Sequence, residues 1–412
     1  MKRAADGKPK RTAMEKSKVE EGPKDLFGRP LEKMGDWEFI GDELLIFSPK
    51  GLEHHPKIAS FDMDGTLITT KSGKVFPTDT HDWKLWHDSV SSKLKELHDN
   101  NFKLVIFTNQ KGIKQRKVDK GAFMKKIEAI VKKIGQPIQV FVSTGDAEYR
   151  KPMTGMWRKL CEEYNGEVAV DLAASLYVGD AAGRHKTAKR EKKDHSLADR
   201  FFALNVGISF HTPEQFFLNQ KEEEPWGPLP FDPPTLLSRK HTLLDPEDTV
   251  LPWPEREIIV MVGSPGSGKS HFARMLMKRH GYVVANRDTL GTWQKCVAAA
   301  RHSLVEGKSV VIDNTNPDIE SRKRYIFLAK ELKVPVRCFE MTTSFAHSCH
   351  NVKFRTITRG ETDVSTMVLR MHANKYKKPE MREGFSAVVH VNFVPEFDSD
   401  HDRKLYQQYL VE

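Results

Sequence analysis

The spacing of apolar residues divides the chain into two series of alternating strands and helices. Short apolar runs such as KIASF and KLVIF are typical of buried strands, and the segments between them have helix-like spacing. Such alternation favours a parallel sheet flanked by helices. We therefore predict an α/β protein with two domains, each a mainly parallel sheet with helices against it. The predicted strands are 57–61, 103–107, 138–143, 175–179, 257–263, 282–286, 309–313 and 335–341, preceded by a strand–turn–strand at 36–49; the predicted helices are 89–98, 121–134, 154–164 and 347–359.

Proline-rich sequence separates the two series. Residues 222–237 and 251–255 are rich in proline, which lacks the N–H that helices and sheets use, so we interpret this region as a connection without regular elements. The predicted organisation is a disordered basic tail, a first α/β domain, a proline-rich connection and a second α/β domain. Their limits are residues 1–24, 25–215, 216–254 and 255–412.

Composition narrows the class of protein only a little. The 412 residues carry a formal net charge of +10, of which residues 1–24 contribute +4. A basic balance suits a polyanionic partner, because lysine and arginine release the counterions condensed on phosphates. The four cysteines have no CxxC spacing, which favours a reducing compartment over disulfides or a zinc site. No apolar run approaches the ~18 residues that span a bilayer, so we expect no membrane segment.

The first candidate site follows the strand at 57–61. In the segment ASFDMDGTL, Asp62 and Asp64 are two positions apart, so an extended backbone turns both carboxylates the same way. Thr108, Lys151 and Asp180 follow later strands or the loops after them, and parallel strands present such residues at one edge of a sheet.

This set of residue types indicates phosphoryl hydrolysis. Asp62, Asp64 and Asp180 would repel one another by roughly 4 kcal/mol per pair at ~4 Å, and a Mg²⁺ ion would relieve that repulsion. Asp62 can attack phosphorus as a nucleophile, while Asp64 serves as general acid and then base. Thr108 and Lys151 can hold the phosphoryl oxygens. We expect Asp180 to be the one acid supplied by its segment, with Asp194 and Asp199 as weaker candidates.

The second candidate site is a phosphate-binding loop. Residues 263–270 read G-x-x-x-x-G-K-S between an apolar strand and a helical pattern, which is the context this loop requires. Backbone N–H groups of the loop would surround the ATP phosphates, Lys269 would reach them, and Ser270 would bind Mg²⁺. The predicted ATP-binding residues of the loop are Gly263, Ser264, Pro265, Gly266, Ser267, Gly268, Lys269 and Ser270.

Further residues favour a kinase over an ATPase. Asp288 follows the strand at 282–286 and can accept the proton of an attacking hydroxyl. Asp313 stands where a second Mg²⁺-binding acid is expected, although it could simply cap the next helix. Arg355 and Arg359, on the predicted helix 347–359, are candidates for an arginine lid over the phosphates. Arg322 and Arg324 are alternatives for that lid.

The motifs together resemble the polynucleotide kinase 3′-phosphatase family from about residue 36 onward. FDMDGT, FTNQKGI, YRKP and YVGDAAGR resemble its phosphatase half, which is similar to haloacid-dehalogenase phosphatases over residues 36–212. VGSPGSGKS, NRDTLG, VIDNTNP and GFSA resemble its kinase half. The resemblance implies removal of 3′-phosphates and phosphorylation of 5′-hydroxyls at nucleic-acid ends, with ATP and Mg²⁺. It implies Asp62 as nucleophile, Asp64 as general acid, Asp288 as kinase base, and Arg287, with Arg324 and Asn109, as substrate contacts.

Some expectations follow only from that resemblance, and some alternatives stay open. A nuclear, monomeric DNA-repair enzyme is implied, with repair scaffold and ligase proteins as the class of protein partner. About 35 residues precede the first strands, too few for a forkhead-associated domain, so recruitment by phosphorylated scaffolds is not expected. A fused small-metabolite phosphatase and kinase, an RNA end-repair enzyme and a catalytically inactive binding protein remain alternatives.

Overall fold

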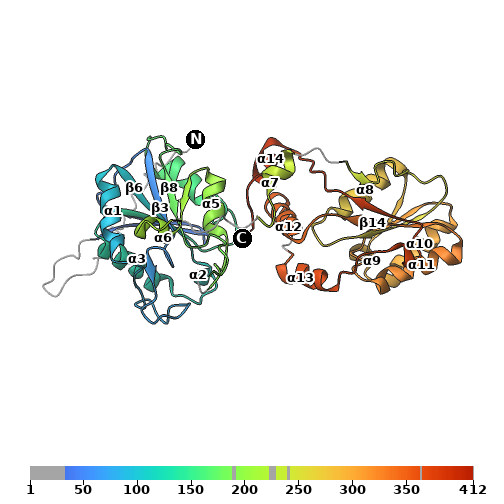
Figure 1. The fold of residues 1–412 in the computed structure, drawn as a ribbon, viewed down its shortest axis with the longest axis horizontal. Helices are drawn as coiled ribbons and strands as arrows, with labels where there is room; N and C mark the ends of the chain where they lie inside the picture. The colour runs from blue at the N-terminus through green and yellow to red at the C-terminus, as the bar shows by residue number, and fades with distance from the viewer. Residues whose placement is uncertain (1–32, 188–191, 222–228, 239–241, 362–363, 412) are drawn as a thin grey trace, which may run out of the picture.

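The computed structural model describes residues 33–187, 192–221, 229–238, 242–361 and 364–411, and within them the chain forms two α/β lobes (Figure 1). The predicted tail at residues 1–24 lies outside the described residues. No helix of the described ranges is both long and apolar enough to cross a bilayer.

The N-terminal lobe is built on a seven-stranded sheet of order β1-β2-β7-β6-β3-β8-β9. The strand pairs β7–β6, β6–β3, β3–β8 and β8–β9 are parallel. The pairs β1–β2 and β2–β7 are antiparallel. A separate two-stranded ribbon, β4–β5, lies outside this sheet. The strands are β1 Gly35–Ile40, β2 Leu44–Pro49, β3 Lys57–Phe61, β4 Ile68–Thr69, β5 Lys84–Leu85, β6 Phe102–Asn109, β7 Ile138–Ser143, β8 Leu176–Val178 and β9 Ser209–His211.

Side-chain alternation along these strands supplies two cores, one on each face of the sheet. Leu104 and Ile106 of β6 pack in one apolar cluster with α1, α3 and α6, whereas Val105 and Phe107 pack in another with α4 and α5. The helices are α1 Ser89–Asp99, α2 Lys111–Lys114, α3 Lys120–Ile134, α4 Gly155–Lys159 with a π-turn Leu160–Tyr164, α5 Ala198–Val206 and α6 Pro213–Leu218.

The C-terminal lobe is built on a six-stranded sheet of order β10-β15-β14-β11-β13-β12, parallel except at β10. Ile258 and Val260 of β11 pack with α10 and α11, and Ile259 and Met261 pack with α8 on the other face. The elements are α7 Pro233–Ser238, β10 Leu244–Asp245, β11 Ile258–Val262, α8 Lys269–His280, β12 Val283–Ala285, α9 Arg287–Leu290, α10 Trp293–Val305, β13 Val310–Ile312, α11 Ile319–Leu332, β14 Val336–Met341, α12 Phe345–Arg359, α13 Thr366–Lys375, a 3₁₀ turn Met381–Glu383, β15 Ala387–Val391 and α14 Asp400–Tyr406.

The predicted α/β class with two mainly parallel sheets is confirmed, and every predicted strand and helix is present within a few residues. The expectation that the proline-rich region holds no element is wrong. Helix α7 begins at Pro233 inside it, since proline is tolerated where a first-turn N–H has no acceptor within the helix. Strand β10 also lies within residues 216–254 and joins the second sheet. The domain limits themselves stay a prediction.

Candidate active sites

The first site lies at the carboxyl edge of the N-terminal sheet, where β3 ends. The backbone N–H of Asp62 still donates to the Val178 carbonyl of the neighbouring β8 at 2.9 Å, which fixes the start of the loop beside that strand. The Asp62 side chain is buried. The end of β3 therefore holds the Asp62 carboxylate in a fixed position that is largely shielded from water.

Lys151 is the electrostatic centre of this site. Its Nζ donates to Asp62 Oδ1, Asp199 Oδ1 and the Tyr177 hydroxyl, each at 2.7 Å, so all three ammonium protons have acceptors. Burial opposes the charge on Lys151, but the Asp199 and Asp62 carboxylates outweigh it and raise its pKa. The lysine is therefore a fixed cation beside the predicted nucleophile.

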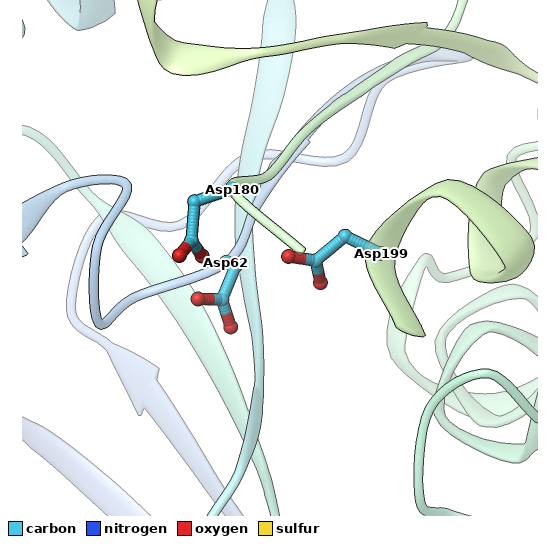
Figure 2. Close-up of side chains that lie close together, drawn as sticks. All are labelled: Asp62, Asp180 and Asp199. Carbon is cyan, nitrogen blue, oxygen red and sulfur yellow. The ribbon is translucent and has the colours of Figure 1, made fainter. Parts of the chain in front are cut away.

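Three carboxylates meet beside this lysine. Figure 2 shows Asp62, Asp180 and Asp199 approaching from three separate segments, and one oxygen of each lies within 4.8 Å of the others. Asp199 comes from the first turn of α5, and the close packing requires Gly179, whose added Cβ would lie 2.5 Å from the Asp199 side chain. Helix α5 thus brings Asp199, a weaker candidate in the sequence, into the same group, and the role of Asp180 as the one acid serving from its segment stays a prediction.

Asp199 is only a weaker candidate in the sequence, because it lies 19 positions after Asp180 and nothing local marks it. Its Oδ1 accepts from Lys151 and Tyr177, and its Oδ2 accepts from the Ala181 N–H at 2.9 Å. Both oxygens are thus occupied within the protein, which makes Asp199 a positioning residue. Asp194 is also occupied, since it accepts from the N–H groups of Ala182 and Arg184 and from the Arg184 guanidinium.

The acids fit a divalent cation. Burial, reinforced by neighbouring carboxylates, raises the pKa of Asp180 above its usual range. Burial likewise raises the pKa of Asp62, although Lys151 opposes the shift. One lysine cannot neutralise both Asp62 and Asp180 while it also pairs with Asp199. A cation between them would let both ionise, and oxygen donors suit Mg²⁺.

Exposed Asp64 and buried Thr108 share one hydrogen-bond donor. Gln110 Nε2 donates to Asp64 Oδ2 at 2.7 Å and to the Thr108 hydroxyl at 3.0 Å. Lys126 approaches the other Asp64 oxygen at 3.4 Å, and the Asp64 side chain is 48% exposed. Asp64 lies outside the three-acid group, in a position open to substrate. Gln110 and Lys126 were not identified from the sequence.

Asn109 holds the main chain of Lys151 in place. Its Oδ1 accepts from the Lys151 N–H at 3.0 Å and its Nδ2 donates to the Lys151 carbonyl at 3.1 Å. Its side-chain amide is therefore used within the protein. The predicted substrate contact through Asn109 stays a prediction.

A prediction follows from Gly65, which has φ +86° and lies against Asp180. An added Cβ would stand 2.6 Å from Asp180 Oδ2, so Gly65→Ala should displace that carboxylate and reduce phosphatase turnover about 100-fold. The measurement is phosphate release at saturating substrate. Gly73→Ala is the matched control, because Gly73 has φ +71° but meets nothing within 4 Å. An equal loss of turnover in the two variants would show that backbone strain alone causes the effect.

The second site lies at the carboxyl edge of the C-terminal sheet, between β11 and α8. Gly266 and Gly268 have φ +79° and +99°, and a Cβ on Gly266 would stand 2.5 Å from the Ser348 carbonyl of α12. Such a loop turns successive backbone N–H groups toward one point, where phosphate binds. Asn351 of α12 supports the loop by donating to the Gly266 carbonyl at 2.9 Å.

Lys269 lies inside this loop and is buried. Its Nζ donates to the Ser264 carbonyl at 2.7 Å. The pKa of Lys269 is lowered to about 8, mainly by burial and also by the Arg355 charge, while Asp313 and Asp288 partly oppose the shift. Bound phosphates would stabilise the ammonium, so the loop fits a polyphosphate. Ser270 follows in the first turn of α8 and is exposed.

Asp313 and Asp288 belong to the same polar network. Asp313 directly follows β13 and is buried; its Oδ2 accepts from Asn286 at 2.9 Å, while its Oδ1 has no hydrogen-bond partner. An orphaned buried carboxylate oxygen fits a cation ligand better than a helix cap. The same Asn286 caps α9 by accepting from the Asp288 N–H at 2.6 Å, which leaves the Asp288 carboxylate exposed to substrate.

The candidate arginines separate into distinct environments. The charge of Arg355 contributes to the lowered pKa of Lys269, and its Nη1 lies 3.4 Å from a Glu361 carboxylate oxygen. Arg359 lies one turn further along α12 and its side chain is half-exposed. Arg287 is exposed on α9, and the Arg324 guanidinium lies 4.2 Å from the centroid of the Trp293 ring. Their contacts with nucleotide and substrate stay predictions.

Arg322 is unavailable to a phosphate, contrary to its place among the lid alternatives. It is fully buried and forms two hydrogen bonds to Glu383, at 2.8 and 2.6 Å, while Nη1 donates to the Asn316 and Lys377 carbonyls. Arg322→Leu should therefore lower the free energy of unfolding by about 3 kcal/mol, since it leaves Glu383 buried and unpaired. Chemical denaturation measures this, with Arg324→Leu as control. A change under about 1 kcal/mol would contradict the assignment.

His372 of α13 is a neighbour of the loop that the sequence did not reveal. Burial lowers its pKa, and the Lys269 charge lowers it further, which places the imidazole near the ammonium. Its Nε2 is buried without a hydrogen-bond partner. A single histidine on a helix carries no local signal, so the sequence alone could not identify it.

Comparisons with known proteins match both halves of the chain. The family described as "Polynucleotide kinase 3 phosphatase" matches residues 57–217, and an "AAA domain" family matches residues 258–297. The bifunctional polynucleotide phosphatase/kinase of Schizosaccharomyces pombe is 39% identical over 360 residues, covering 86% of this chain and 84% of that protein. A putative bifunctional polynucleotide phosphatase/kinase of Acanthamoeba polyphaga mimivirus is 33% identical over 390 residues, covering 88% and 91%.

A third relative matches one half. The polynucleotide 3′-phosphatase of Arabidopsis thaliana is 37% identical over 204 residues, which cover 46% of this chain and 28% of that protein. Both catalytic halves thus have relatives, and the two bifunctional relatives match across nearly their whole length. The chain belongs to the family of bifunctional polynucleotide phosphatase/kinases.

Proposed function

We propose that this protein repairs DNA strand breaks by removing 3′-phosphates at the first site and phosphorylating 5′-hydroxyls at the second. The observation that carries the proposal is the presence in one chain of a buried aspartate–lysine cluster and an ATP loop facing an exposed aspartate. The two chemistries convert the two ends of one unligatable break into ligatable ends. The family of the relatives supports nucleic acid as the substrate.

In the phosphatase reaction, Asp62 attacks the phosphorus. Lys151 holds Oδ1, and we assign the attack to the other oxygen, which forms an aspartyl-phosphate as the bond from phosphorus to the 3′ oxygen breaks. Asp64 protonates the leaving 3′ oxygen and then takes a proton from the water that attacks the aspartyl-phosphate. Inorganic phosphate leaves and Asp62 is restored. Thr108 and Lys151 stabilise the negative charge on the phosphoryl oxygens.

In the kinase reaction, the loop and Lys269 bind the ATP phosphates. Asp288 accepts the proton of the 5′-hydroxyl as its oxygen attacks the γ-phosphorus, and the bond between the γ-phosphorus and the bridging oxygen of ADP breaks. Arg355 and Arg359 stabilise the transferring group, and Arg287 and Arg324 contact the phosphates of the strand.

Asp62 and Asp180 would hold Mg²⁺ at the phosphatase site, with Asp64 as a further predicted ligand. Ser270 and Asp313 would hold Mg²⁺ at the kinase site. In each site Mg²⁺ supplies charge neutralisation of phosphate oxygens.

The cellular setting is part of the same proposal. We place the protein in the nucleus as a monomer, with repair scaffold and ligase proteins as its partners. The net charge of +10 supports electrostatic attraction to DNA. Salt dependence of binding to a nicked duplex would measure the number of phosphates neutralised.

The deciding assay uses a nicked duplex with a 3′-phosphate and a 5′-hydroxyl, made as DNA and as RNA. With ATP and Mg²⁺, both ends of the DNA nick should change, and chelation of Mg²⁺ should stop both reactions. Faster turnover of the RNA nick would favour RNA end repair. Turnover of small phosphorylated sugars without action on either nick would favour a metabolic enzyme, and no change at any end would overturn the proposal.

A further inference from the structure

A short segment at the end of the described chain joins the two lobes, and we call residues 406–411 the clamp segment. It begins at the last residue of α14 in the kinase lobe and contacts the phosphatase lobe, and Figure 1 marks the C-terminal end beside the green and blue elements. Its role is not contained in either reaction described above. The contacts along it suggest what it does.

Both ends of the clamp segment are anchored on the kinase lobe, one of them through Asn351 to the ATP loop. Tyr406 is buried, and its hydroxyl donates to Asn351 Oδ1 at 2.6 Å. The amide of Asn351 donates in turn to the Gly266 carbonyl at 2.9 Å. Val411 packs against the apolar cluster formed by α12 and α13. The segment is therefore fixed to the part of the kinase lobe that binds phosphate.

Between these two anchors, Tyr409 contacts helix α5 of the phosphatase lobe. The Tyr409 ring stacks on Phe201, with centroids 4.3 Å apart and planes 13° from parallel. The Tyr409 N–H donates to Asn205 Oδ1 at 2.7 Å, and Asn205 Nδ2 donates back to the Tyr409 carbonyl at 3.0 Å. The Tyr409 hydroxyl also donates to Asp232 at 3.0 Å. This is a specific, two-way contact rather than loose packing.

Asn205 connects this grip to the catalytic lysine by two routes. Its Nδ2 also donates to the carbonyl of Pro152 at 2.8 Å, one residue after Lys151. Its helix, α5, carries Asp199, which accepts from Lys151 Nζ at 2.7 Å. A helix transmits displacement nearly as a rigid body, so release of Tyr409 would move both supports of Lys151 together.

We propose that Tyr409 and Asn205 are positioning residues for the 3′-phosphatase, so that the kinase lobe completes the phosphatase site through the clamp segment. The inference rests on the proposed function in one respect, the use of Lys151 in phosphate hydrolysis. Lys151 has three acceptors at 2.7 Å, and a displacement of about 1 Å would break this arrangement in the transition state. The expected cost therefore falls on turnover, not on substrate affinity.

The test compares Tyr409→Ala and Asn205→Ala with the full-length protein, using a 3′-phosphorylated DNA oligonucleotide. We expect the phosphatase kcat to fall about tenfold with KM within about twofold, while the 5′-kinase kcat of the same preparations stays unchanged. Tyr409→Phe keeps the stacking and the backbone hydrogen bonds, and should retain wild-type turnover. Gln407→Ala is the control within the segment, because Gln407 is exposed.

Lys151→Gln separates failure of this inference from failure of the proposed function. An inactive Lys151→Gln with fully active Tyr409→Ala and Asn205→Ala would overturn the clamp and leave the phosphatase site standing. Equal loss of both activities in Tyr409→Ala would also overturn it, because general destabilisation lowers the two together. An active Lys151→Gln would instead overturn the assignment of the phosphatase site.

Discussion

Asp62→Asn should abolish removal of 3′-phosphate, with a loss of at least ~10³-fold in kcat, while 5′-phosphorylation continues at the wild-type rate. The amide keeps the shape of the carboxylate and can still accept from Lys151, so the fold should be unaffected. It cannot form an aspartyl-phosphate, and it removes a negatively charged cation ligand. Phosphate release from a 3′-phosphorylated oligonucleotide measures the first activity, and label transfer from ATP measures the second.

The control for that variant is Asp99→Asn, an exposed aspartate at the end of α1 that should retain both activities. The sensitivity of the assay matters, because traces of a contaminating phosphatase would mimic residual turnover. More than about a tenth of wild-type turnover in purified Asp62→Asn would show that another group attacks phosphorus. Loss of the kinase activity as well would indicate that the substitution disturbs the whole chain.

Asp288→Asn should reduce transfer of phosphate to 5′-hydroxyls by ~10²–10⁴-fold and leave 3′-phosphatase turnover unchanged. The variant retains the backbone N–H of residue 288, which donates to Asn286 Oδ1 at the start of α9. Helix α9 and Asp313, which accepts from the same Asn286, should therefore stay in place. The amide cannot accept the proton of the attacking hydroxyl. The affinity for ATP should change little, because Asp288 acts on the acceptor and not on the nucleotide.

Label transfer from ATP to a 5′-hydroxyl oligonucleotide measures the effect, and equilibrium titration with ATP measures the affinity. Asp398→Asn is the control, since Asp398 is exposed in the same lobe. Full kinase turnover in Asp288→Asn would exclude it as the base. Parallel loss of ATP binding would assign the residue to the nucleotide site.

The two predictions together exploit the separation of the sites. Asp62 follows β3 of one sheet and Asp288 follows β12 of another, so each variant should silence one activity. The proposed clamp segment would couple the two lobes, because Tyr409 contacts α5, the helix that carries Asp199, a partner of Lys151. A double variant of Asp62 and Asp288 should lose both activities and still bind the nicked duplex.

The architecture and the main polar groups at each sheet edge can be predicted from the sequence. Apolar runs identified the strands, and parallel strands deliver the residues that follow them to one edge, so Asp62, Lys151 and Asp180 come together in the structure as the pattern predicts. The phosphate-binding loop was evident because its glycines, lysine and serine are contiguous. Such signals are local in sequence, and local backbone geometry is enough to interpret them.

The polar residues that support those groups become apparent in the packed fold alone. Asp199 reaches Lys151 because α5 folds back over the sheet, and no spacing rule marks that approach. Arg322 is a lid candidate in the sequence, but in the fold it is buried and paired with Glu383, which lies 61 positions away. Tyr409 meets Asn205 across 204 residues. Contacts of this kind depend on how packed elements meet, because burial of apolar surface, and not the identity of neighbouring residues, sets which side chains become partners.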